Sequence, residues 1–338
     1  MADHLVMGVV VVLLNGQGRK TEETNMSFEI NIQLGPVDPL VRPGLTTRSA
    51  TIAGPLGPLA ELPGTWKGTG FNQIWRPFHG TSDRFLELNL TEETLTFSHS
   101  IGSIPNRGLL QADTELFGIH YLQQITDKLA KTGIHVEPGF WVTVPTTTDP
   151  AEGATVVRMA SIPHGTTVNA QGTALFVNGG PHIDPVSIAP FGIGSPPPPN
   201  TTLAFPPFNE ANLSIPTTFR LPNPIPASIT QAMVNNPNSV LTAAIAGQTI
   251  TKTTVLIINT AVAAPLTGGG TDNISFLKGG AGGPNADAAQ MSAIFWIEHV
   301  AAHGGHPAFL QLQYTQTVLL NFNGLSWPHV SVATLRKH

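Results

Sequence analysis

Residues 62–70 of the sequence read Leu62-Pro63-Gly64-Thr65-Trp66-Lys67-Gly68-Thr69-Gly70. A Gly-x-Trp at the start of a strand is a packing device of β-barrels: the indole plugs one end, and the glycines let the strand bend sharply. The chain ends on a strand-like segment that reaches Arg336, and a cation from a last strand often lies on such an indole face. We therefore predict that the first and last strands pair to close a barrel, with Trp66 near Arg336 at its closed end.

Most of the chain has the pattern of short strands separated by turns. Apolar and polar residues alternate in short segments, and 34 Gly and 30 Pro residues punctuate them. The segments predicted as strands are 5–14, 27–34, 85–90, 94–99, 117–122, 140–144, 155–160, 166–170, 174–177, 248–259, 291–300, 309–322 and 329–335, with a turn at 91–93. Short strands at this spacing predict a mainly β fold, an antiparallel barrel of lipocalin type with a few short helices.

The composition excludes several classes of function. Among 338 residues, 16 Lys and Arg stand against 21 Asp and Glu, a net charge of −5, so nucleic acid is not an expected partner. Cys is absent, which excludes disulfides and thiolate chemistry, whereas 12 His make imidazole the best candidate metal ligand. The apolar run at 5–14 is interpreted as a strand rather than a cleaved signal peptide. No stretch reaches the ~20 apolar residues of a membrane helix, so we expect no membrane partner and a cytoplasmic location.

The sequence predicts an N-terminal extension followed by one barrel domain. Residues 1–55 are interpreted as an extension whose strands pack on the barrel, and residues 56–338 as the barrel domain. A Pro-rich insertion at 181–227 is expected to be an ordered loop that wraps the barrel, anchored by its Phe residues; a polyproline ligand is the alternative. Two short helices and a second, Gly-rich insertion are predicted at 229–235, 240–246 and 265–285.

Five short motifs, in the same order along the chain, resemble the nitrobindins, a family of haem-binding β-barrels. The motifs are Gly64-Thr65-Trp66-Lys67-Gly68-Thr69-Gly70, Leu95-Thr96-Phe97-Ser98-His99-Ser100, Glu137-Pro138-Gly139-Phe140-Trp141, Ala160-Ser161-Ile162-Pro163-His164-Gly165-Thr166 and Pro328-His329-Val330-Ser331-Val332-Ala333-Thr334-Leu335-Arg336. The last motif is similar to the family's closing strand, whose His is the axial ligand of the iron. At 71–75 the sequence departs from the Tyr-Pro-Thr-Ile of the family.

This resemblance implies a function in haem binding. It implies haem b as the cofactor, His329 as the iron ligand, and Thr65 and Ile74 as residues that contact the haem. It also implies that His99 and His164 lie at the open side of the iron, where they would act on a small oxidant. The reactions that it implies are peroxynitrite isomerisation, binding of nitric oxide and peroxidase-like reduction of peroxides.

Each His also has a structural interpretation that needs no family. His329 shares a strand face with small or apolar residues, which suits a ligand inside a barrel but also a core His bonded to a carbonyl. His99 fits a buried structural residue, and His164 fits an exposed residue of a turn. The remaining strand histidines, His120 and His135, are expected to be partly exposed.

Two other functions remain open from the sequence. A lipocalin-like barrel without metal could carry an apolar small molecule. A zinc-dependent hydrolase could use His299, His303 and His306, which follow Glu298, although Gly304-Gly305 favours a loop with solvated histidines. A small molecule is the expected partner in each case, and a homo-oligomer is compatible with the sequence.

Overall fold

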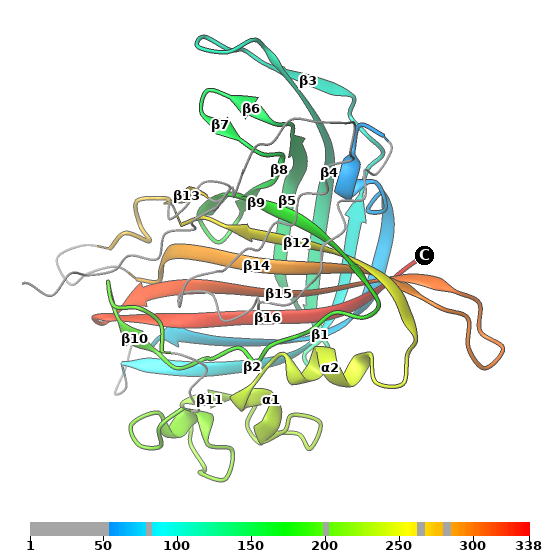
Figure 1. Cartoon of the computed structure of the whole chain (residues 1–338). Coiled ribbons are helices and arrows are strands. Elements are labelled where there is room, and N and C mark those ends of the chain that lie inside the picture. Colours follow the sequence, from blue (N-terminus) through cyan, green and yellow to red (C-terminus); the bar gives the residue numbers. More distant parts are fainter. Residues whose placement is uncertain (1–53, 79–82, 199–202, 262–267, 280–284) are drawn as a thin grey trace, which may run out of the picture.

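The protein folds as a closed β-barrel in the computed structural model, which describes residues 54–78, 83–198, 203–261, 268–279 and 285–338. Ten long strands of this described part form the wall, and Figure 1 shows them curving around one interior. They are β1 (Gly64–Pro77), β2 (Arg84–Phe97), β4 (Thr114–Asp127), β5 (Gly133–Val144), β8 (Thr155–Ile162), β9 (Thr166–Asn178), β12 (Ile250–Asn259), β14 (Asp287–Val300), β15 (Phe309–Phe322) and β16 (Leu325–Lys337). The predicted mainly β, antiparallel barrel is confirmed. The strand predictions at 5–14 and 27–34 lie outside the described residues.

The barrel closes by pairing of its first and last strands. Each wall strand pairs antiparallel with the next in the order given above, and β16 returns to β1. In the closing register, Trp66 stands opposite Lys337 and Lys67 opposite Arg336. Because side chains alternate between the two faces of a strand, Lys337 reaches the indole of Trp66, while Arg336 lies over Phe309 on the outside. The prediction that Trp66 lies near the end of the last strand is confirmed, but the expected cation, Arg336, was wrong by one residue.

Two glycines let β1 and β16 approach each other closely. A Cβ at Gly68 would lie 2.0 Å from the carbonyl oxygen of Thr334, and one at Gly70 would lie 2.2 Å from that of Val332. Any larger residue at either position would push the two backbones apart. The glycines of the first motif therefore serve the closing seam of the barrel.

One end of the barrel is filled by a hydrophobic core. Trp66 is fully buried there, and its indole nitrogen donates to the carbonyl oxygen of Leu62 at 2.8 Å. The short 3-10 helix η1 (Gly57–Leu59) adds Leu59 to the same core. Trp141 and Phe295 pack edge to face within it, with ring centroids 5.2 Å apart. This is the closed end expected from the Gly-x-Trp motif.

The described residues 181–198 and 203–246, called the wrap below, pack against the outside of one side of the barrel. They contain only short elements: β10 (Phe191–Gly192), η2 (Asn209–Ala211), β11 (Arg220–Leu221), α1 (Gln231–Asn235) and α2 (Ser239–Ala244). Together with outward-facing residues of β1, β2, β12, β14 and β16, the wrap builds a second core. Trp75 lies at its centre, with ring centroids 5.9 Å from Phe208 and 5.5 Å from Trp327. In Figure 1, α1 and α2 lie beside β2 and β1 on this side.

Three local strand predictions differ from the structure. β2 runs unbroken through 91–93, where the sequence predicts a turn, because Thr91 and Glu93 point into the barrel and hydrogen-bond each other at 2.8 Å. β9 is likewise continuous across 171–173. The Gly-rich insertion contributes a strand of its own, which pairs with β9. Besides β10 and β11 of the wrap, the described strands outside the wall are β3 (Ser103–Asn106), β6 (Thr147–Thr148), β7 (Ala151–Glu152) and this strand, β13 (Gly268–Asn273).

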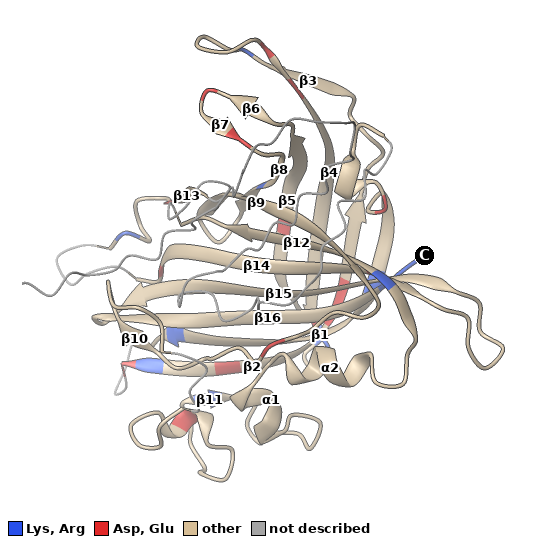
Figure 2. Cartoon of the chain, viewed as in Figure 1, with Lys and Arg blue, Asp and Glu red and all other residues tan. Residues whose placement is uncertain are grey.

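Charged residues are few, at 11% of the sequence. In the cartoon of Figure 2, the Lys and Arg positions are scattered along the chain and form no continuous stripe. Within the described ranges, no helix has both the length and the apolar character needed to cross a bilayer.

Candidate functional site

A cavity of ≈ 400 Å³ lies inside the barrel, away from the end that Trp66 fills. Alternate side chains of β1 face opposite sides of the wall, so Asn72, Ile74 and Arg76 line the cavity. Trp75, which lies between Ile74 and Arg76, faces the wrap. The volume lies in the range of about 300–1,000 Å³ that is typical of small-molecule sites. The polar lining residues considered below are Asn72, Glu93, Gln123, His135, Glu137, Arg158, His164, Gln316, His329 and Ser331.

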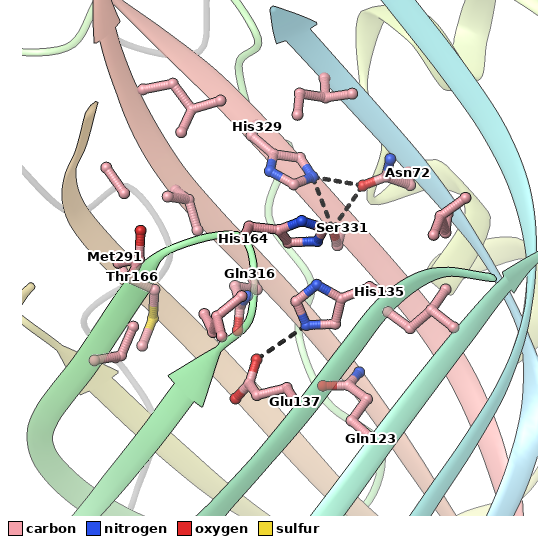
Figure 3. A pocket seen from close by; sticks show the side chains of 18 of the residues that line it. Asn72, Gln123, His135, Glu137, His164, Thr166, Met291, Gln316, His329 and Ser331 are labelled. Carbon is pink, nitrogen blue, oxygen red and sulfur yellow. Dashed lines mark hydrogen bonds and ion pairs between the residues drawn. The ribbon is translucent and has the colours of Figure 1, made fainter. Parts of the chain in front are cut away.

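His329 projects from β16 into this cavity (Figure 3). Its Nε2 lies 2.7 Å from Oδ1 of Asn72 on β1, and the hydroxyl of Ser331 donates to the same oxygen at 2.8 Å. Asn72 and Ser331 are directly opposed in the register of the two strands. Nδ1 of His329 makes no hydrogen bond to a described residue. The ring is therefore held along one edge, while its other nitrogen has no hydrogen-bond partner among the described residues.

The environment of His329 keeps its imidazole uncharged. Its pKa is lowered to about 3, first by burial and then by the neighbouring imidazoles of His135 and His164. The atom that contacts the ring nitrogen belongs to an amide, which offsets little of the cost of a buried charge. At neutral pH the ring thus carries one N–H and one lone pair.

Two further imidazoles face the same cavity. His135 of β5 lies beside His164, with ring centroids 5.5 Å apart, and its Nε2 is 3.2 Å from Oε2 of Glu137. His164 sits in the turn between β8 and β9 and is exposed at the mouth of the cavity. Partial burial lowers the pKa of His164, and the nearby His135 lowers it further. Figure 3 shows the rings of His329, His164 and His135 following one another along the cavity.

A buried ion pair forms part of the cavity wall. Arg158 of β8 donates to Glu137 of β5 at 2.5 Å, to the amide oxygen of Gln316 at 2.6 Å and to the hydroxyl of Tyr121 at 2.8 Å. Tyr121 in turn donates to Glu137. Burial favours a higher pKa for Glu137, but the charge of Arg158 and the hydrogen bonds from His135 and Tyr121 outweigh it and hold that pKa at about 2. Glu137 is thus ionised at every physiological pH.

A second carboxyl in the wall behaves in the opposite way. Burial raises the pKa of Glu93 on β2, and the hydrogen bonds that it accepts offset this only in part. Tyr314 donates to its Oε2 at 2.6 Å and Thr91 to its Oε1 at 2.8 Å. No Lys or Arg of the described residues pairs with it, so it lacks the compensation that Arg158 gives to Glu137. The cavity therefore offers one carboxylate that is always charged and one that takes up a proton more readily.

The structure brings together three of the five site residues expected from the sequence. His329, His164 and Ile74 line the cavity. Thr65 and His99 do not line it, and both belong to the closed end: Thr65 pairs with Thr96 next to Trp66, and His99 is an exposed residue just after β2. His99 is therefore not the buried residue of the structural interpretation, and the open cavity starts several residues beyond Thr65 along β1.

The sequence reasoning missed His135, Arg158 and Asn72 as lining residues. His135 is expected there to be a partly exposed strand residue, yet it points into the barrel. The signal was present: from the buried Trp141, a period of two residues leads back through Gly139 and Glu137 to His135. Arg158 and Asn72 carry no such signal, because polar residues inside a barrel look like surface residues in the sequence.

The histidines of the zinc hypothesis do not gather into a metal site. His299 bonds through Nε2 to Oε1 of Glu61 at 2.7 Å. His303 and His306 pair with each other through their backbones in the exposed connection between β14 and β15. Across the described residues, no group of three or more His, Cys, Asp or Glu is arranged to hold a metal ion. The loop interpretation of this segment is the one that fits.

Comparisons with known proteins give a distant structural similarity. No family model matches the sequence, and no curated protein matches it. Among solved structures, the chain is similar to the one described as the crystal structure of Rv2717c from M. tuberculosis, with 12% identity and a TM-score of 0.35, over 83% of this chain and 94% of that chain. At this identity and TM-score, the similarity carries no argument about ligand or activity.

Proposed function

We propose that the barrel binds haem b in this cavity, with His329 as the axial ligand of the iron. The observation that carries the proposal is an imidazole that stays neutral at physiological pH and projects into a ≈ 400 Å³ cavity, with one nitrogen that no described residue hydrogen-bonds. A neutral imidazole is the usual proximal ligand of haem iron when the sixth position stays open.

The other lining residues are chemically compatible with this group. Ile74, Ile125, Met291, Val318 and Leu320 provide apolar surface for a porphyrin. Arg76 lines the cavity, is half exposed and pairs with Glu87 at 3.3 Å. A haem propionate could compete with Glu87 for this guanidinium. Within the described residues, no group of three or more His, Cys, Asp or Glu is arranged to hold a bare metal ion, which suits a metal already held by a macrocycle.

Bound haem would supply an iron with an open position for nitric oxide, a peroxide or peroxynitrite. Within that proposal, His329 holds the iron, and His164 and His135 offer ring N–H groups toward a small ligand in the cavity. His164 is exposed at the mouth, and its lowered pKa favours the neutral imidazole at physiological pH. The resemblance to nitrobindins favours peroxynitrite isomerisation among these reactions.

Absorption spectroscopy of the reconstituted protein tests the proposal. Wild type loaded with one equivalent of haem should give the Soret band of a His-ligated haem, and His329→Ala should lose it, with recovery on addition of free imidazole. His99→Ala is the matched control, because this exposed residue lies at the closed end and its loss should leave the band unchanged. A wild-type Soret band that survives in His329→Ala would contradict the assignment.

A metal-free carrier of a small molecule is the second candidate. The observation in its favour is that Nε2 of His329 is bonded to Asn72, and that Arg158, Glu137 and Gln316 make part of the wall polar. On this alternative, purified wild type shows no haem spectrum, yet the fluorescent probe anilinonaphthalene sulfonate binds in the cavity. Replacing Val318 with Trp, which fills the cavity, should then abolish binding of the probe.

A further inference from the structure

A line of hydrogen-bonded side chains connects His329 with Asp127 across three seams of the barrel. Nε2 of His329 lies 2.7 Å from Oδ1 of Asn72, and Nδ2 of Asn72 lies 2.9 Å from Oδ1 of Asn89. Nδ2 of Asn89 lies 2.7 Å from Oδ2 of Asp127. The four residues lie on β16, β1, β2 and the last position of β4, which are neighbours in the wall.

Asp127 fixes the direction of this line because an ionised carboxylate can only accept hydrogen bonds. Its Oδ1 accepts from the backbone N–H groups of Leu129 and Ala130 at 2.7 Å each, in the turn that follows β4. Its Oδ2 is left to face Asn89. Asn89 must therefore turn its NH₂ group toward Asp127, and the same Nδ2 also lies 3.4 Å from Oε1 of Glu87. Asn89 is almost fully buried, so solvent cannot compensate for the opposite orientation of its amide.

The orientation of each following group is then determined in turn. With its NH₂ group on Asp127, Asn89 presents its oxygen to Asn72, which must donate to it. Asn72 then presents its own oxygen to the ring of His329. Ser331 donates to the same oxygen, which is consistent with an oxygen at that position and not a nitrogen.

We propose that Asp127, acting through Asn89 and Asn72, holds His329 in the tautomer with a proton on Nε2 and a lone pair on Nδ1. Asp127, Asn89 and Asn72 are positioning residues that touch no ligand themselves. The proposal deepens the function proposed above by assigning the iron-binding atom to Nδ1 of His329, and that assignment rests on haem binding. The assignment of the tautomer stands independently of any ligand.

The substitution Asp127→Asn tests the proposal because it should reverse the direction of donation in each hydrogen bond between residue 127 and His329. The new amide keeps its oxygen on the N–H groups of Leu129 and Ala130, so its NH₂ group replaces Oδ2. We expect Asn89 then to present its oxygen to that group, at the expense of its longer 3.4 Å contact with Glu87, and Asn72 to present its NH₂ group to His329. The ring nitrogen Nε2 becomes an acceptor, and the proton moves to Nδ1.

The readout is ¹⁵N NMR of the ligand-free protein labelled at histidine. A ring nitrogen with a proton and one with a lone pair resonate in well-separated regions, so the tautomer is read directly. We expect Nε2–H in wild type, Nδ1–H in Asp127→Asn, and a mixture in Asn72→Ala, which removes the contact without touching the turn. The control Ser331→Ala should keep the wild-type tautomer. A wild-type ring with its proton on Nδ1, or an unchanged tautomer in both Asp127→Asn and Asn72→Ala, would overturn the proposal.

A haem titration of the same proteins separates this proposal from the function. If Nδ1 is the ligand atom, Asp127→Asn should bind haem about tenfold more weakly than wild type. In this variant Nδ1 carries the proton, so the ring must change its tautomer before Nδ1 can bind the iron. If the tautomers are as expected but neither wild type nor any variant binds haem, the proposed function is wrong while the assignment of the tautomer holds. If wild type binds haem through Nε2, the assignment of the ligand atom is overturned while haem binding stands.

Discussion

The ammonium nitrogen of Lys337 lies 5.3 Å from the centroid of the Trp66 ring and donates to the carbonyl oxygen of Glu61 at 2.6 Å. One side chain at the end of the last strand thus contacts both the first strand and the segment that precedes it. This contact joins the two ends of the sheet at the place where the barrel closes. The preceding residue, Arg336, also lies over an aromatic ring, that of Phe309, but on the outer face of the barrel.

We expect Lys337→Met to destabilise the fold by about 1–2 kcal/mol, through loss of the cation–π contact and of the hydrogen bond to Glu61. Arg336→Met, one residue away on the outer face, is the matched control and should cost clearly less. Urea unfolding followed by tryptophan fluorescence measures both. Equal effects of the two substitutions would mean that the closing contact has no special role.

The neutral state of His329 predicts a loss of stability in acid. Its pKa is about 3 in the fold and about 6.5 in an unfolded chain, so below pH 6.5 the unfolded state binds a proton that the folded state does not. Stability is unaffected by this group above pH 6.5 and falls as the pH decreases toward 3. Between pH 6.5 and pH 5 the difference amounts to about 2 kcal/mol. The fall should be absent in His329→Gln and retained in His120→Gln, which replaces an exposed residue; chemical unfolding at the two pH values checks this.

The buried Glu298 on β14 predicts that the protein loses stability as the pH rises from 4.5 to about 7. This carboxyl is fully buried and accepts one hydrogen bond, from Gln311 at 2.6 Å, and burial raises its pKa to about 7. The unfolded chain therefore ionises first as the pH rises above 4.5, and stability falls until the pH exceeds 7. Glu298→Gln keeps the shape and removes the ionisation, so we expect it to stabilise the protein at pH 8 by about 2–3 kcal/mol and to be nearly neutral at pH 4.5. Thermal unfolding at both pH values is the measurement, and a gain that does not depend on pH would contradict the explanation.

The closing seam should not tolerate a methyl group at Gly68. Its Cβ would lie 2.0 Å from a backbone oxygen of β16, and a backbone cannot move aside as a flexible side chain can. We expect Gly68→Ala to destabilise the fold by about 3 kcal/mol or to prevent folding. Gly133→Ala is the control, because nothing lies within 4 Å of its Cβ and its φ is not in the left-handed region. Soluble yield and urea midpoints of the two variants give the comparison.

The closure of the barrel could be predicted from sequence because it depends on local signals at both ends of the chain. Trp66 with its glycines marks the first strand, and the alternation after His329 marks the last one. The same alternation, applied to Lys337, also identifies the residue on the indole. Position along a strand sets the face of a side chain, so His329 could be placed inside the barrel without knowing its neighbours.

The surroundings of His329 could not be predicted in the same way. Asn72, Asn89 and Asp127 meet because of the register between separate strands, and register is not visible in any one of them. The polar stretch of β2 gives the clearest case: Thr91 and Glu93 look like a turn in the sequence, yet they face a partly polar barrel interior. Polar residues there satisfy one another, which removes the hydrophobic pattern on which strand prediction relies.

The wrap divides the barrel into two halves that should differ in amide hydrogen exchange. β1, β2 and β16 carry a core on both faces, whereas β4 and β5 leave side chains such as Leu122 and Phe140 exposed on their outer face. Strands buried on both sides open only with the whole fold, while strands covered on one side can open separately. His164 and His135 belong to the singly covered half, and His329 to the doubly covered one. A small molecule would therefore reach the cavity past β4 and β5, the strands that need less free energy to open. It would then lie against His329 on β16, a strand that opens only with the whole fold.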